Sequence, residues 1–166
     1  ALTHGTGDWT LRLLLLGLAM TPLRLILKQS WPIRFRRLIG LYAFFYACLH
    51  FAIYLFLDLG SYWSQIGADI IKRPFITVGF TAWLLLIPLA FTSNQWMMRR
   101  LKRNWQKLHK LVYAIGILGV LHYWWLVKSD VREPLLYAGI LALLFAIRLK
   151  PRLNSWLARK RASDHG

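Results

Sequence analysis

Three histidines lie inside or at the edge of long apolar segments of this 166-residue chain. His50 and His122 lie within runs that carry no charged residue, and His109 lies at the start of the run that contains His122. Ionisable groups at such positions are costly to bury and mark candidate functional sites, although an interhelical hydrogen bond is an equal alternative for any one of them. No His-x-x-x-His or Cys/His cluster suggests a zinc site, and no buried carboxylate is present to form a proton relay with them. Paired imidazoles on helices rich in Phe, Tyr and Trp instead suit axial ligation of haem iron, and two imidazole ligands favour electron transfer over oxygen chemistry.

The spacing of these histidines predicts cofactors at two depths of a membrane. His109 and His122 are thirteen positions apart, or about 20 Å along a continuous helix, within a hydrocarbon core about 30 Å thick. His50 lies thirteen residues beyond Arg37, which places it nearer in depth to His122 than to His109. On an ideal helix His109 and His122 point about 140° apart, so a common face requires a π-bulge at the glycines between them.

Five apolar segments predict an all-α, multi-spanning helical transmembrane bundle that forms a single domain over residues 1–166. The segments are too apolar on all sides for surface helices and too long for strands. Pro22 is expected to kink or end the first helix, and Arg148 is expected to snorkel at the end of the last. Cys48, the one cysteine, is interpreted as a packing residue. The predicted spans are residues 11–27, 38–57, 75–91, 109–127 and 134–149.

The charge pattern predicts the topology. Of the 22 basic residues, 17 lie in stretches 24–37, 99–110 and 148–161, which alternate with the spans so as to share one side. The positive-inside rule makes that side the cytoplasm, with the start of the chain outside and its C-terminus inside. These basic loops are interpreted as topology signals that also contact lipid headgroups. The alternative is that they also bind a cytoplasmic partner or haem propionates. The outer loop 58–74 predicts a short interfacial helix, with a docking face as the alternative.

Seven motifs follow one another along the whole chain. They are THGTGDWTLR from Thr3, TPLR from Thr21, RRLIGLYAFFYACLH ending at His50, RPFITVGFTAW from Arg73, LAFTSNQ from Leu89, WQKLHKLVY around His109 and HYWW around His122. In their order and spacing these motifs resemble the MsrQ (YedZ) family of the ferric-reductase-like transmembrane superfamily. The resemblance implies six helices, the first of which precedes residues 1–166. It also implies one or two b-type haems held by His50, His109 and His122.

The analogy and the depth count disagree on how the histidines pair. By analogy with the oxidases of the superfamily, His50 pairs with His109, which leaves His122 without a partner. His4, at the outer level, is then a candidate to complete a second haem site. His165 lies in the polar C-terminal end and is expected to have no role.

The resemblance implies a haem electron-transfer subunit of an oxidoreductase complex in the bacterial inner membrane, not a complete enzyme. Electrons would enter from a quinol pool or a cytoplasmic flavin reductase and leave to a molybdenum-containing periplasmic methionine sulfoxide reductase subunit. That subunit would repair oxidised periplasmic proteins. The family is also associated with FMN. The chain has no Gly-x-Gly-x-x-Gly and no P-loop, so NAD(P)H chemistry is expected in a partner.

Two alternatives remain open. One is a self-standing ferric or quinone reductase cytochrome b. The other is a small membrane transporter or structural protein whose histidines only join helices, and it predicts a colourless preparation.

Overall fold

The structure, a computed structural model, describes residues 2–60, 62–127 and 130–164, so Ala1 and His165 lie outside the described residues. Over these ranges the chain is helical and contains no strand, which confirms the all-α prediction. The longer helices are α1 (Leu2–Leu27), α2 (Trp31–Ile53), α4 (Pro74–Phe91), α7 (Leu111–Leu126) and α8 (Arg132–Asp164). The shorter elements are η1 (Tyr54–Asp58), η2 (Trp63–Gln65), α3 (Ile66–Lys72), α5 (Gln95–Leu101) and α6 (Arg103–His109).

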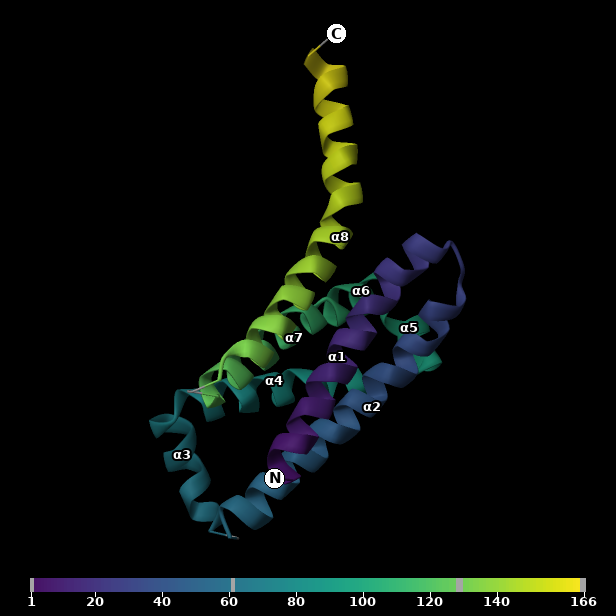
Figure 1. The fold of residues 1–166 in the computed structure, drawn as a ribbon. Helices are drawn as coiled ribbons and strands as arrows, with labels where there is room; N and C mark the ends of the chain where they lie inside the picture. Colours follow the sequence, from purple (N-terminus) through teal and green to yellow (C-terminus); the bar gives the residue numbers. More distant parts are fainter. Residues whose placement is uncertain (1, 61, 128–129, 165–166) are drawn as a thin grey trace.

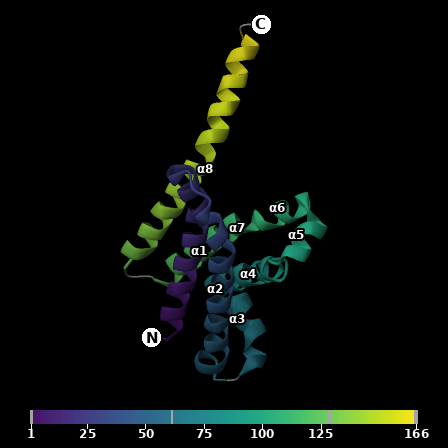
Figure 2. The same ribbon diagram turned by 90° about the vertical axis from the view of Figure 1, so that its right-hand side faces the viewer.

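The helices form two close pairs that meet at one end. α1 and α2 run side by side in opposite directions, and the α4–α7 pair crosses them (Figures 1 and 2). Because the chain reverses direction between successive long helices, the starts of α1 and α4 come together with the ends of α2 and α7. The core around Ile115, which is 0% exposed, joins these four helices, and a second core around Leu18 joins α1 and α7 to α8.

The two faces of α2 show why this fold suits a membrane. Ala43 and Ala47, 0% and 7% exposed, let the backbones of neighbouring helices approach closely. The opposite face carries exposed large apolar side chains at intervals of three, four or seven residues, which only an apolar solvent accommodates as a continuous stripe. In α2 these are Phe35, Leu38, Tyr42, Phe45 and Leu49, and Phe56 continues the row in η1.

The helix bounds differ from the predicted spans at three places. α1 begins at Leu2 and not at residue 11, and the hydroxyls of Thr6 and Thr10 bond to backbone carbonyls within this added part of the helix. The fourth apolar helix begins at Leu111, so His109 ends α6 and not the same helix as His122. α8 continues past residue 149 to Asp164. Among the described residues, four helical segments are long and apolar enough to cross a membrane, and α7, with 16 residues, is a shorter apolar helix.

Pro22 does not end α1, which continues to Leu27. Proline has no backbone N–H, so the carbonyl of Leu18, four residues earlier, loses its helical donor. Arg148 of α8 donates from Nη2 to this carbonyl oxygen at 2.7 Å and from Nη1 to the Tyr113 hydroxyl. The prediction that Arg148 snorkels was therefore wrong. Its guanidinium points into the bundle because the Leu18 carbonyl would otherwise lack a partner away from water.

This contact makes the effect of Arg148 depend on Pro22. We expect Arg148→Met to lower the free energy of unfolding by about 1–3 kcal/mol, because it leaves a buried carbonyl unsatisfied. In a Pro22→Ala background the loss should be smaller, because the N–H of residue 22 can then bond to the Leu18 carbonyl. Thermal unfolding of the four variants in detergent measures this coupling. An equal loss in both backgrounds would contradict the interpretation.

Candidate functional site

The rings of His50 and His122 face each other where the two helix pairs meet. Their centroids lie 6.2 Å apart, with an angle of 81° between the ring planes. His50 belongs to α2 and His122 to α7, and both side chains are half-buried. This contact agrees with the depth count, which placed His50 nearer to His122.

The first turns of α1 hold the ring of His50. Nδ1 of His50 lies 2.8 Å from the backbone oxygen of Thr3 and 3.3 Å from the Thr6 hydroxyl. A Cβ added at Gly7 would lie 3.1 Å from Cε1 of His50, closer than nearly all real Cβ contacts. The segment THGTG thus supplies a carbonyl (Thr3), a hydroxyl (Thr6) and space (Gly7) for one imidazole ring.

The start of α4 holds His122 in the same way. Nδ1 of His122 lies 2.6 Å from the backbone oxygen of Phe75, and a Cβ at Gly79 would lie only 2.7 Å from that nitrogen. The spacing is the same in both places. The glycine lies four positions, and the histidine 47 positions, after the residue whose carbonyl accepts the hydrogen bond, which is Thr3 for His50 and Phe75 for His122. The α1–α2 and α4–α7 pairs therefore present their histidines through the same local arrangement.

This arrangement leaves one nitrogen of each ring free to bind a metal. A backbone carbonyl only accepts hydrogen bonds, so Nδ1 of each ring carries the proton and Nε2 keeps its lone pair. A metal about 2.0–2.1 Å from two such nitrogens would hold the ring centroids roughly 6.3 Å apart. The observed centroid separation of 6.2 Å matches that spacing. The separation of the ring centroids is therefore compatible with one metal ion held between the two Nε2 atoms.

A cavity of about 390 Å³ adjoins the two rings. Its volume is in the range of sites that bind organic ligands. Aromatic side chains form much of its wall, and the Phe51 and Trp83 rings stack there with centroids 4.6 Å apart. Charged residues on the cavity wall are Asp8, Asp58 and Arg73. This combination suits a large, flat, apolar group with a charged edge.

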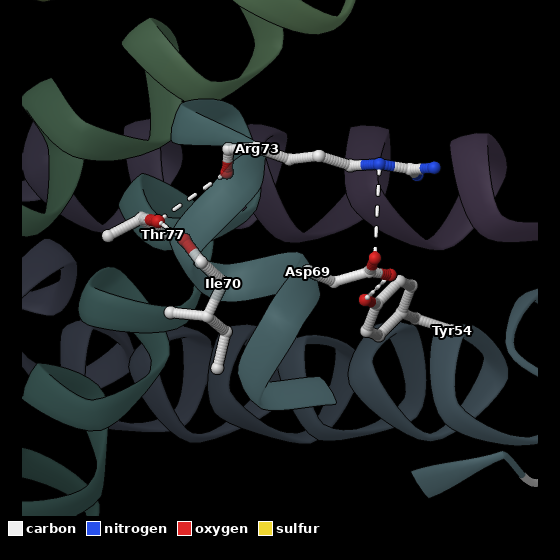
Figure 3. A network of polar contacts seen from close by, with 5 residues as sticks. All are labelled: Tyr54, Asp69, Ile70, Arg73 and Thr77. Atoms are coloured by element: carbon white, nitrogen blue, oxygen red, sulfur yellow. Dashed lines mark hydrogen bonds and ion pairs between the residues drawn. The ribbon is translucent and has the colours of Figure 1, made fainter. Parts of the chain in front are cut away.

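A polar network links the two histidine-bearing regions (Figure 3). Tyr54, one turn after His50, donates to Oδ2 of Asp69 at 3.0 Å. The other oxygen of Asp69 lies 4.0 Å from Nε of Arg73, two residues before Phe75. Thr77 continues the network by donating to the Ile70 carbonyl. The short α3 helix, which confirms the short helix predicted in loop 58–74, therefore ties the end of α2 to the start of α4.

His109 lies apart from the pair and does not line the cavity. Its ring stacks on Trp105 with centroids 3.9 Å apart, and its Nδ1 lies 3.0 Å from the Trp105 carbonyl oxygen. Nε2 of His109 is buried and has no hydrogen-bond partner in the described part of the chain. The structure thus brings His50 to His122, and the pairing of His50 with His109 by analogy has no counterpart in it.

The remaining predictions about this region have mixed outcomes. His4 lines the cavity but its side chain is exposed. α7 is a regular α-helix, without the π-bulge that a common face for His109 and His122 would require. The π-helical turn is η1, directly after α2. Sequence reasoning missed Thr3, Gly7, Phe75 and Gly79, although the repeated spacing of 47 residues was a signal that could have found them.

Comparison with known proteins agrees with this architecture. Residues 6–120 match the family described as "Ferric reductase like transmembrane component". The "Protein-methionine-sulfoxide reductase heme-binding subunit MsrQ" of Xanthomonas campestris is 63% identical over 98% of this chain and 73% of its own length. The protein of the same name from Xanthomonas axonopodis is 64% identical over 92% of this chain and 70% of its own. That from Herminiimonas arsenicoxydans is 47% identical over 99% and 74%.

No solved structure gives a significant match. The family match covers more than half of the chain, and the apolar helices identify an integral membrane protein. The family match and the sequence identity to these relatives along nearly all of the chain support the same assignment. This chain belongs to the MsrQ family of ferric-reductase-like transmembrane proteins.

Proposed function

We propose that this chain is a haem-containing electron-transfer subunit of a methionine sulfoxide reductase system. The observation that carries the proposal is the His50–His122 pair, with ring centroids 6.2 Å apart and each Nδ1 bonded to a backbone carbonyl. The similar proteins are named as haem-binding subunits of protein-methionine-sulfoxide reductase, and these names support the same function.

In this proposal His50 and His122 are the axial ligands of one b-type haem. The group supplies one-electron redox chemistry when bound. The carbonyls of Thr3 and Phe75 fix the tautomer and the orientation of the two rings. Arg73, at the cavity wall, is suited to bind a propionate carboxylate. Two imidazole ligands on one haem would leave no open site for oxygen chemistry, which favours electron transfer, and His4 on the cavity wall would not be needed as a ligand.

We assign a second haem to the level of His109. Its buried Nε2 has no hydrogen-bond partner within the described ranges, while its Nδ1 is held by the Trp105 carbonyl. This is again the state in which the ring can donate a lone pair to a metal. Two haems at two levels would carry electrons across the membrane.

The proposed direction of electron flow follows from the charge pattern. The basic stretches on one side favour a cytoplasmic location for that side in the bacterial inner membrane, with the His50–His122 pair on the periplasmic side. Electrons would enter from a quinol pool or a cytoplasmic flavin reductase, with FMN as an associated cofactor. They would leave to a molybdenum-containing periplasmic catalytic subunit that reduces methionine sulfoxide in oxidised proteins.

This function is tested by following the haem absorbance of the full chain in nanodiscs. We expect a quinol or a flavin reductase with its reductant to reduce the haem anaerobically. Adding the catalytic subunit with methionine sulfoxide should then reoxidise it, while the sulfoxide alone should not. Failure of the catalytic subunit to reoxidise the haem would contradict the assignment.

A second candidate function is a self-standing ferric reductase, which the name of the matching family favours. It predicts rapid reoxidation of the reduced haem by a ferric chelate without any partner protein. The same nanodisc preparation distinguishes the two functions through the relative rates with a ferric chelate and with the catalytic subunit.

A further inference from the structure

The end of α8 carries an apolar stripe that the described chain does not cover. Residues 150–164 are all exposed, although they continue the helix without a break. Leu153 and Trp156 are 55% and 56% exposed. The stripe consists of Leu149, Leu153, Trp156 and Leu157, whose spacing of one, three and four residues puts them on one helix face.

Basic side chains flank this stripe on both sides. At 100° per residue, Arg152 and Arg159 fall on one side of the stripe and Lys150 and Arg161 on the other, each roughly 75–105° from its centre. Lys160 falls on the stripe itself, one turn after Trp156, and its Nζ lies over the Trp156 ring, 5.6 Å from the ring centroid. Residues 150–164 thus carry five basic side chains and a single acidic one, Asp164.

The geometry of α8 separates this segment from the bundle. Leu144 is the last buried residue of α8, and Arg148 makes the last hydrogen bonds from α8 to α1 and α7. Beyond that point the helix rises clear of the other helices (Figures 1 and 2). Pro151 cannot donate to the Ile147 carbonyl, which makes this the place where the helix bends most easily.

We propose that residues 150–164, here called the tail segment, bind the surface of an anionic phospholipid bilayer. The apolar stripe would lie at the boundary between headgroups and acyl chains, and the flanking cations would contact lipid phosphates. The groove of a partner protein is the alternative binding site for the apolar stripe. The basic side chains on both sides of the stripe match the continuous negative charge of a bilayer surface better than such a groove. This inference shares the topology proposed above but does not depend on the haem.

The test uses the full chain in nanodiscs with a single fluorescent label. Cys48→Ser removes the native thiol, and a cysteine replaces either Leu153, in the stripe, or Ala158, on the opposite face. We expect an environment-sensitive label at position 153 to be shielded from iodide in phosphatidylcholine discs containing phosphatidylglycerol. The label at position 158 should remain accessible, and shielding at position 153 should weaken in phosphatidylcholine alone.

Charge variants test the electrostatic part. Arg152→Gln, Arg159→Gln and Arg161→Gln together should lower the binding constant of the segment for the anionic surface on the order of 100-fold. The matched control Asn154→Gln, which changes no charge, should leave binding unchanged. Equal accessibility at positions 153 and 158 in anionic discs, equal shielding in both lipids, or shielding that requires an added soluble protein would each overturn the proposal.

Discussion

His50→Ala and His122→Ala should each remove the same equivalent of haem, and the double variant should lose no more than either single variant. The reason is that the two neighbouring rings are proposed to hold the same haem, so the loss of either imidazole would leave an incomplete site. We expect each single variant to lower haem affinity at this site by at least about a hundredfold, since even outer-shell changes cost 10–100-fold. Haem content per protein, by pyridine haemochrome and Soret absorbance, gives the measurement.

Two matched variants control this experiment. His4→Ala should keep the haem content and spectrum, because His4 has no axial position to fill. His109→Ala should remove a different equivalent, so its effect should add to that of His122→Ala. If the His50→Ala and His122→Ala losses add, the two residues bind different haems and the shared site is wrong. Circular dichroism and gel filtration of each variant establish that the fold is retained.

Gly79→Ala should damage the same site without changing any ligand. The new Cβ would lie 2.7 Å from Nδ1 of His122, where that nitrogen bonds to the Phe75 carbonyl, so the ring must move. Loss of this orienting contact is expected to lower haem affinity about 10–100-fold and to shift the midpoint potential. Haem titration and a redox titration of the purified variant measure the two effects.

Other glycines provide a graded comparison for that result. Gly7→Ala should have a weaker effect, because its Cβ would lie 3.1 Å from Cε1 of His50 and a small ring displacement relieves the contact. Gly40→Ala in α2 meets no heavy atom within 4 Å and should leave haem affinity unchanged. Alanine stabilises a helix by up to about 1 kcal/mol relative to glycine. This gain is shared by Gly79→Ala and Gly40→Ala, so the two variants differ in the contact with His122. Equal affinities for Gly79→Ala and Gly40→Ala would contradict the proposed role of Gly79.

Much of the architecture follows from the sequence because it depends on local properties. Long uncharged runs such as residues 38–57 require helices in a membrane, and the basic stretches between them predict sidedness. The candidate ligands were also identifiable, since a histidine such as His122 within such a run is unusual. Counting residues from Arg37 gave the depth of His50 closely enough to place it near His122.

Other features depend on which helices become neighbours. Arg148 was expected at the membrane surface, but the Leu18 carbonyl freed by Pro22 lies within its reach only because α8 packs against α1. Residues 109–127 were expected to form one continuous helix. The separate α6 is stabilised by contacts of Trp105, whose indole donates to the Thr92 carbonyl at 2.8 Å.

The sequence by itself determined that His50 and His122 lie within apolar runs and His109 at the edge of one, and it predicted all three as haem ligands. Only the tertiary structure decided that His50 meets His122, and that Thr3 and Phe75 orient the two rings. The physical reason is that depth along a helix follows from residue count, whereas direction around it follows from packing. The α1–α2 and α4–α7 pairs turn both imidazoles inward, because Gly7 and Gly79 leave room for rings that any larger residue would displace.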